Sequence, residues 1–244
     1  MLGLSFKPKP KPQLPAGIRI YAVSDIHGCA DLLSDVFAAI DHHLARSEPI
    51  RALHVYLGDY IDRGPASRQT IDMLIERSRR HESVFLKGNH EAFLLEVLQH
   101  PSRLEAWGEY GGFQTLMSYG LAPSIRPDRE EQKQLVQGLL HGIPKHHCRF
   151  FGNLRPSFRC GDFFFAHAGV KPGVPLRRQR EEDLLWIRDE FLQSEEDFGK
   201  FIVHGHTPVE KPDIRANRIN IDTGAYATGV LTLLTIDGDR MFAI

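Results

Sequence analysis

The chain has 244 residues, of which 42% are hydrophobic and 25% are charged, and its formal net charge is -1. This composition is typical of a folded globular protein and argues against an intrinsically disordered chain. Because the net charge is close to zero, we expect no nucleic-acid partner and no attraction to acidic membrane surfaces.

The cysteine content and the distribution of apolar residues indicate a cellular compartment. The three cysteines, Cys29, Cys148 and Cys160, are an odd number and form no CxxC pair. A disulfide framework and a structural zinc ribbon are therefore not expected, and a reducing cytoplasm is the simplest location. No apolar run approaches the roughly 20 residues that a membrane-spanning helix needs, so we expect no membrane partner.

The chain is expected to start with a tail and continue as one domain. Lysine and proline alternate from Lys7 to Pro12, a composition that favours an extended, solvated segment. We expect residues 1–17 to be flexible and residues 18–244 to form a single domain.

The first half of that domain alternates between strand and helix patterns. Short apolar runs at 18–23, 52–57 and 84–86 predict buried strands, and helical spacing of apolar residues predicts helices near 32–44 and 71–75. A β-α-β-α-β order favours a parallel sheet flanked by helices, and ligands of such sheets bind beyond the carboxyl ends of the strands.

The remainder of the chain is predicted to contain an inserted helical cap and further strands. Residues from about 92 to 142 show a helical, more polar pattern that we interpret as the cap. Strand-like runs return at 156–159, 163–166, 201–203, 219–221 and 230–236, and the last is predicted to form a hairpin with 240–243. One helix is expected over 181–191.

Polar residues with ligand chemistry follow five of the predicted strands. Each site alone is weak evidence, because a single histidine or aspartate is usually a surface or structural residue. As a set they offer carboxylate, amide and imidazole ligands without a thiolate, which suits Mn²⁺, with Fe or Zn as alternatives. Counting ligands suggests two divalent ions that share Asp59. The candidate ligands are Asp25, His27 and Asp59 for the first ion, and Asp59, Asn89, His167 and His206 for the second.

The motifs together resemble the calcineurin-like metallophosphoesterases. They are Asp25-x-His27-Gly28, Gly58-Asp59-x-x-Asp62-Arg63-Gly64, Gly88-Asn89-His90-Glu91, His167-Ala168-Gly169 and Gly205-His206-Thr207. Asp62-Arg63-Gly64, and Pro208 in place of a second ligand histidine, resemble the phosphoprotein phosphatase branch. That branch includes bacterial serine/threonine protein phosphatases and symmetrical diadenosine tetraphosphate hydrolases. The implied fold is α/β, a four-layer α-β-β-α sandwich with a helical cap insertion.

The resemblance implies a mechanism and roles for further residues. A hydroxide bridging the two metal ions would attack phosphorus in line with the leaving group, and His90 would donate a proton to that group. Asp62 would orient His90, whereas Arg63 and Arg188 would bind the phosphoryl oxygens. Lys87 stands where the family commonly has an arginine, which leaves its contact with phosphate in question.

Two substrate classes remain open at this stage. We expect a serine/threonine protein phosphatase first, with a phosphoprotein or a phosphorylated small molecule as its partner, and hydrolysis of diadenosine tetraphosphate as the alternative. The cap carries rings at Trp107, Tyr110, Phe113 and Tyr119 that could stack on a nucleotide. Their helical spacing is more typical of core residues. A binding scaffold without turnover is disfavoured because every ligand position and the proton donor are present.

Overall fold

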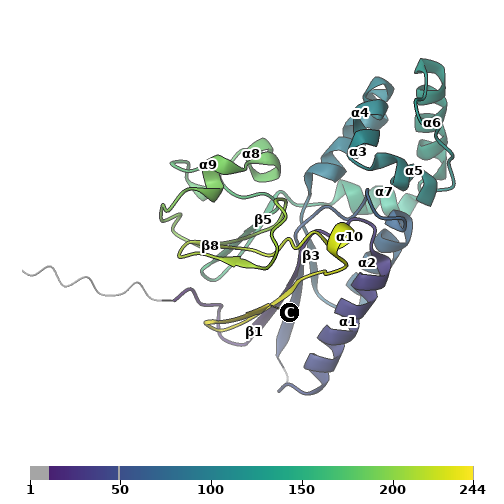
Figure 1. Cartoon of the computed structure of the whole chain (residues 1–244). Coiled ribbons are helices and arrows are strands. Elements are labelled where there is room, and N and C mark those ends of the chain that lie inside the picture. Colours follow the sequence, from purple (N-terminus) through teal and green to yellow (C-terminus); the bar gives the residue numbers. More distant parts are fainter. Residues whose placement is uncertain (1–10, 49, 244) are drawn as a thin grey trace, which may run out of the picture.

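The computed structural model describes residues 11–48 and 50–243. Two five-stranded sheets pack face to face, and helices cover their outer faces (Figure 1). In the first sheet the strand order is β10-β9-β1-β2-β3, and β1, β2 and β3 run parallel, as the β-α-β-α-β pattern predicts. Its strands are β1 (Ile18–Val23), β2 (Arg51–Tyr56), β3 (Ser83–Phe85), β9 (Leu233–Asp237) and β10 (Arg240–Ala243).

The second sheet has the order β4-β5-β6-β8-β7, with β5, β6 and β8 parallel. The carboxyl ends of its parallel strands and those of the first sheet carry the polar motifs. Its strands are β4 (Ser157–Cys160), β5 (Phe163–Ala166), β6 (Phe201–His204), β7 (Asp213–Ile214) and β8 (Arg218–Asn220). The two-residue strand β7 was not predicted.

Alternation of side chains along each strand produces three separate layers of core. In β1, Ile20 faces the second sheet, whereas Tyr21 packs under the helices α1 (Ala30–Ala45) and α2 (Ser67–Arg80). In β5, Phe165 faces the first sheet, and Phe164 packs under the short helices on the other side. Successive strand residues point to opposite faces, so both sheets are buried on both faces. The four-layer sandwich is confirmed.

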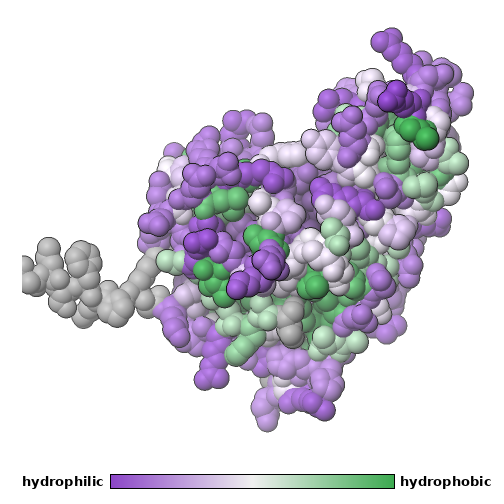
Figure 2. Space-filling view, viewed as in Figure 1, coloured by the Kyte–Doolittle hydropathy of each residue, from purple (hydrophilic) through white to green (hydrophobic). Residues whose placement is uncertain are grey.

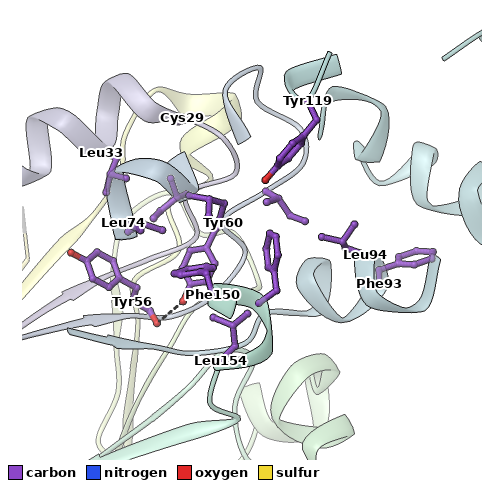
Figure 3. Close-up of a cluster of buried hydrophobic side chains, with 14 of the residues drawn as sticks. Cys29, Leu33, Tyr56, Tyr60, Leu74, Phe93, Leu94, Tyr119, Phe150 and Leu154 are labelled. Carbon is purple, nitrogen blue, oxygen red and sulfur yellow. Dashed lines mark hydrogen bonds between the residues drawn. The ribbon is translucent and has the colours of Figure 1, made fainter. Parts of the chain in front are cut away.

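A group of helices follows β3 and stands at one end of the molecule (Figure 1). The interval contains α3 (Asn89–Gln99), α4 (Leu104–Glu109), α5 (Gly112–Ser118), α6 (Arg129–Gly142) and α7 (Lys145–Gly152), with a 3-10 turn at Pro101–Arg103. Helix α7 joins this group to the sandwich: Phe150 packs against Tyr60 with ring centroids 5.5 Å apart, and Tyr60 donates a hydrogen bond to the carbonyl of Tyr56 (Figure 3).

The helix predicted over 181–191 is wrong as a continuous element. It is divided into α8 (Glu181–Trp186) and α9 (Asp189–Leu192), and Arg188 between them has φ -131° and ψ -107°. In an unbroken helix Leu184, Arg188 and Phe191 would lie on one face, because residues three and four apart are neighbours. The break lets Leu184 and Phe191 enter the core while Arg188 stays exposed.

The predicted flexible tail is wrong for its last residues. Leu14 is buried between the sheets, and its N–H donates to the carbonyl of Gly238. Gln13 donates its N–H to the Asp162 carboxylate and accepts the N–H of Asp162. This segment therefore closes one side of the core. The first ten residues, which contain most of the Lys-Pro alternation, lie outside the described residues.

The surface is polar over the face shown in Figure 2, with hydrophobic residues in small, separate patches. Within residues 11–48 and 50–243, no helix combines the length and the apolar character that crossing a membrane requires.

Candidate metal centre and active site

Five polar motifs converge where the carboxyl ends of strands from both sheets meet. They follow β1, β2, β3, β5 and β6, and almost all of their functional side chains are buried. Parallel strands deliver their carboxyl ends to one edge of a sheet, so motifs far apart in sequence become neighbours. The side chains brought together are Asp25, His27, Asp59, Asp62, Arg63, Asn89, His90, His167 and His206.

Asp59 is the shared member of two clusters with metal-ligand geometry. One Asp59 oxygen lies 3.6 Å from Nε2 of His27 and 3.8 Å from Nε2 of His90. The other oxygen lies 3.4 Å from Nε2 of His167, and His206 completes that second group. Each carboxylate oxygen therefore faces a different pair of imidazoles.

Asn89 joins the second cluster. Its Oδ1 lies 2.8 Å from Nε2 of His167 and 2.9 Å from Nδ1 of His206, and these two ring nitrogens are 3.1 Å apart. The Nδ1 of His167 is held at 3.0 Å by the carbonyl of Leu57, which orients the ring. A hydrogen bond from one ring nitrogen to a backbone carbonyl leaves the other nitrogen without a proton, as a metal ligand requires.

Asp25 lies beside the first cluster but is not one of the three residues, His27, Asp59 and His90, whose ligand atoms gather most closely there. Its Oδ2 accepts the N–H of His206, and its Oδ1 is buried without a hydrogen-bond partner among the described residues. Burial and the neighbouring acids, Asp222 first, raise the pKa of Asp25 well above its usual value. No cationic side chain pairs with this carboxylate among the described residues, and a bound divalent cation would supply the missing positive charge.

The donor set fits two divalent ions. Burial lowers the pKa of His27 to about 3 and that of His206 to about 2, so both imidazoles are neutral, as metal ligands must be. Oδ1 of Asp25 is buried without a hydrogen-bond partner among the described residues, and Nδ1 of His206 faces Asn89 and His167 in the second cluster. Such orphaned polar atoms are rare in native interiors and point to a missing ligand.

The backbone of the site is strained. Over the described part of the chain, positive φ outside glycine occurs only at His27 (47°), Asp59 (52°), Asp62 (72°), Arg63 (65°) and His206 (68°). Each such conformation costs about 1–3 kcal/mol and persists only where the surroundings impose it. All five residues belong to the predicted site, so the strain is concentrated where the ligands converge.

A second arrangement pairs a histidine with a buried carboxylate. Nδ1 of His90 lies 2.7 Å from Oδ2 of Asp62, and both side chains are buried. Burial lowers the pKa of His90, but the charges of Asp59 and Asp62 outweigh it and hold the pKa above its usual value. This pair can hold a proton on His90 at the edge of the metal clusters.

Both predicted phosphate-binding arginines line the same cavity. The Arg63 guanidinium lies over the ring of Tyr226, 4.5 Å from its centroid. Arg188 is exposed and makes no salt bridge with any residue of the described chain. By contrast, Nζ of Lys87 lies 2.7 Å from a carboxylate oxygen of Glu181. Lys87 therefore ties the start of α3 to α8, and it does not line the cavity.

Comparison with known proteins agrees with this geometry. The profile of the calcineurin-like phosphoesterase family matches residues 18–230, which include every motif described above. The chain belongs to the calcineurin-like phosphoesterase family. It is therefore a metallophosphoesterase, a hydrolase of phosphoric esters.

Curated relatives of this phosphoesterase carry a more specific name. A protein of Geobacillus sp. (strain WCH70) is 25% identical over 235 residues, covering 88% of this chain and 89% of the relative. A protein of Bacillus velezensis is 26% identical over 231 residues, with 86% of both chains covered. Both are named "Bis(5'-nucleosyl)-tetraphosphatase PrpE [asymmetrical]".

Solved structures share the fold of the phosphoesterase. A structure described as that of a "putative diadenosine tetraphosphatase" has a TM-score of 0.64 at 19% identity, covering 96% of this chain and 98% of the other. A protein serine/threonine phosphatase from Saccharomyces cerevisiae has a TM-score of 0.57 at 13% identity, covering 93% and 79%. At these identities the likeness concerns the fold alone.

Helices α4 and α5 of the phosphoesterase, which lie within the predicted cap, hold the Asp62 carboxylate that contacts His90. Oδ2 of Asp62 accepts the indole N–H of Trp107 at 2.8 Å, and Oδ1 accepts the hydroxyl of Thr115 at 2.6 Å. Trp107 is completely buried, which agrees with the core role that the helical spacing of the cap rings favoured over stacking on a nucleotide. Tyr119 is also buried and bonds to His147. Both rings of the cap are structural, and Trp107 acts on Asp62.

Replacing Trp107 by phenylalanine tests this support. We expect Trp107→Phe to lower kcat about tenfold, because a hydrogen bond to a charged group contributes about 1.5–3 kcal/mol. The ring keeps its packing, so bound metal should be unchanged, and the pH profile of kcat should shift because Asp62 holds the His90 proton less firmly. Steady-state kinetics over pH with metal analysis would check this. A loss of metal parallel to the loss of kcat would contradict a positioning role.

Glu91 is a site residue whose role sequence reasoning missed, although it lies within a quoted motif. Its carboxylate accepts the N–H groups of Asp59 (2.9 Å), Tyr60 (2.8 Å) and Gly88 (3.0 Å), and it is fully buried. These bonds hold the strained turn that carries Asp59. Gly88 is required there, since a Cβ at this position would lie 2.0 Å from Oδ1 of Asp59.

Tyr226 was also missed, because it lies on α10 (Ala225–Thr228), a four-residue helix without a periodic signal. Tyr226, Tyr110 and Trp186 line the cavity that contains Arg63 and Arg188. The cavity itself is small, about 30 Å³, and it adjoins a groove of about 450 Å³ that Arg63, Tyr110 and Tyr226 also line. Of these three rings, the sequence had indicated only Tyr110 as a candidate to stack on a nucleotide.

Proposed function

We propose that this phosphoesterase hydrolyses dinucleoside polyphosphates at a two-metal centre. The observation that carries the proposal is that three exposed aromatic side chains line the cavity. Tyr110, Trp186 and Tyr226 are 47%, 42% and 43% exposed, and Phe242 is the only other exposed aromatic residue among those described. Exposed rings beside a phosphate site suit a substrate with planar bases, because each base can stack on an aromatic face.

The ligand assignment follows the two clusters around Asp59. The first ion is assigned to Asp25, His27 and Asp59, and the second to Asp59, Asn89, His167 and His206. The mixture of carboxylate, amide and imidazole supports Mn²⁺, with Fe or Zn as alternatives. When bound, the ions supply Lewis acidity at the phosphoryl group and lower the pKa of water.

The protein's own side chains carry the remaining steps. Arg63 and Arg188 bind the phosphoryl oxygens from the cavity wall, and their planar guanidinium groups suit this contact. His90 donates the proton on its Nε2 to the leaving oxygen, and Asp62 orients the imidazole through Nδ1. The three free cysteines support the expected cytoplasmic location, where thiols stay reduced.

The names of the curated relatives support the same substrate class and alter one detail. Sequence reasoning gave symmetrical diadenosine tetraphosphate hydrolysis as the alternative function, whereas the relatives are named asymmetrical. We therefore expect ATP and AMP, and not two molecules of ADP, as the products from diadenosine tetraphosphate.

The serine/threonine protein phosphatase that sequence reasoning placed first is the second candidate. The observation in its favour is the presence of two open surface grooves beside the cavity. One groove of about 450 Å³ reaches it from the cap side, and another of about 640 Å³, between α1 and α2, shares Tyr226 with it. A phosphorylated peptide needs such open approaches on both sides of the phosphate.

A substrate panel with ring variants tests the proposal. With Mn²⁺, kcat/KM for diadenosine tetraphosphate should exceed that for a phosphothreonine peptide at least tenfold. Tyr110→Ala and Trp186→Ala should each lower the dinucleotide value by about tenfold, since stacking contributes about 1–3 kcal/mol per base, and leave phosphothreonine hydrolysis nearly unchanged. Phe242→Ala, which removes an exposed ring elsewhere, is the matched control.

The outcomes separate the parts of the proposal. A preference for the phosphothreonine peptide would replace the dinucleotide by the second candidate. Chromatography of the products distinguishes asymmetrical from symmetrical cleavage. Activity that survives thorough chelation would overturn the two-metal assignment for every substrate.

A further inference from the structure

A third cluster of metal-ligand side chains lies outside the active site. Asp72 on α2 and the consecutive residues His146 and His147 on α7 bring their ligand atoms within 4.8 Å of one another. None of the three lines the cavity of the active site. The cluster joins α2 to α7, the last of the helices between β3 and β4; this group of helices, α3 to α7, is called the cap interval below.

Both imidazoles point to the same oxygen atom. Oδ1 of Asp72 lies 3.2 Å from Nε2 of His146 and 2.8 Å from Nε2 of His147. Two ligands of one tetrahedral zinc ion, each bound at ~2.1 Å, lie about 3.4 Å apart. In the Asp59 clusters of the active site, Oδ1 of Asn89 lies 2.8 Å from Nε2 of His167, and Oδ2 of Asp59 lies 3.6 Å from Nε2 of His27. The distances from Asp72 to the two imidazoles therefore fall within the range found between proposed ligand atoms of the active site.

The surroundings of His147 match those of a metal ligand. Its side chain is completely buried, and Nδ1 lies 2.8 Å from the hydroxyl of Tyr119. A hydroxyl can accept the Nδ1–H when Nε2 binds a metal, which is how ligand histidines are usually held.

The exposure and the charge of the Asp72–His146–His147 cluster also suit a metal ion. Asp72 and His146 are half exposed, at 50% and 49%, so an ion can enter and keep a water molecule as its fourth ligand. Two imidazoles and one carboxylate, without a thiolate, form a donor set that suits Zn²⁺. With one carboxylate and two neutral imidazoles, a bound Zn²⁺ would leave the site with one net positive charge. The exposed side of the site would keep this charge in contact with water.

We propose that Asp72, His146 and His147 form a separate zinc site that fastens the cap interval to α2. The ion would link α2 and α7 directly and, through Tyr119 at the end of α5, the helix that carries Thr115. Because the unfolded chain cannot assemble the three ligands, zinc binding stabilises the folded protein.

Zinc stoichiometry in variants tests the proposal. The chelated full-length protein is loaded with Mn²⁺, exposed to Zn²⁺, desalted and analysed for both metals. Wild type should retain about one more zinc ion per chain than His146→Ala or Asp72→Asn, because each variant removes one of three ligands. His141→Ala is the matched control, since the one hydrogen-bond partner of this exposed histidine among the described residues is the carbonyl of Gln137 in its own helix.

Thermal unfolding gives a second readout. Zinc should raise the unfolding midpoint of wild type and His141→Ala more than that of the two ligand variants. His146 and Asp72 make no contact with the active site, so hydrolysis with Mn²⁺ shows whether each variant is folded. Equal zinc content, or an equal zinc-dependent shift, in all four proteins would overturn the proposal.

Discussion

Asp59→Asn is expected to remove bound metal and activity together. Asp59 presents one oxygen to His27 at 3.6 Å and the other to His167 at 3.4 Å, so it is the one residue that both clusters share. Asparagine keeps the shape but replaces an oxygen by an NH₂ group and removes the charge. Lewis-acid stabilisation contributes several kcal/mol, so kcat should fall by roughly 10³-fold or more.

Metal analysis beside kinetics checks this result. The variant should retain fewer than two ions per chain after desalting, and excess Mn²⁺ should restore little activity. Asp35→Asn makes the same chemical change at an exposed position of α1 and should behave as wild type. An active Asp59→Asn protein that keeps both metals would overturn the shared role of this carboxylate.

His90→Asn should behave differently, with a large loss of kcat and little loss of metal. Loss of a general acid typically costs about 10²–10⁴ in rate. His90 bonds to Asp62 through Nδ1 at 2.7 Å, which leaves Nε2 facing the cavity. The fall in kcat should be much smaller for an aryl phosphate, because its leaving group departs without a proton.

This variant also decides between two roles for His90. Its Nε2 lies 3.8 Å from Asp59, and by distance alone His90 belongs with His27 and Asp59. If the metal content of His90→Asn drops as far as in Asp59→Asn, His90 is a ligand and Asp25 loses its place in the first set. Retained metal with low kcat would instead agree with the proton donor and leave Asp25 as the third ligand.

The site residues adopt a strained backbone conformation that the surrounding structure imposes. We therefore expect substitutions at these residues to lower activity more than they lower the stability of the fold. His27, Asp59 and His206 adopt positive φ, where side chains other than glycine are disfavoured. Buried hydrogen bonds impose this shape; the Glu91 carboxylate, for example, holds Asp59 and Tyr60 by their N–H groups. The fold therefore maintains the ligand geometry at a cost in stability, as functional sites commonly do.

Much of the fold could be predicted from sequence because its signals are local. The apolar runs that form β1 and β2 lie next to amphipathic helices, so period and order indicate a parallel sheet. In such a sheet the strand ends meet at one edge, which made Asp25, Asp59 and Asn89 candidates before any coordinate was known. The break between α8 and α9 was not predicted, because it depends on which residues of this segment pack against the outer face of the second sheet.

The sequence by itself determined the family, the strand-end motifs and the candidate ligands, since each is written in short stretches of chain. Only the tertiary structure decided how distant stretches act on them. Trp107 of the cap bonds to Asp62, Tyr226 of a four-residue helix lies under Arg63, and His147 meets Asp72 across 75 positions. Such contacts carry no periodic or local signal, because they arise when separate elements pack against one another.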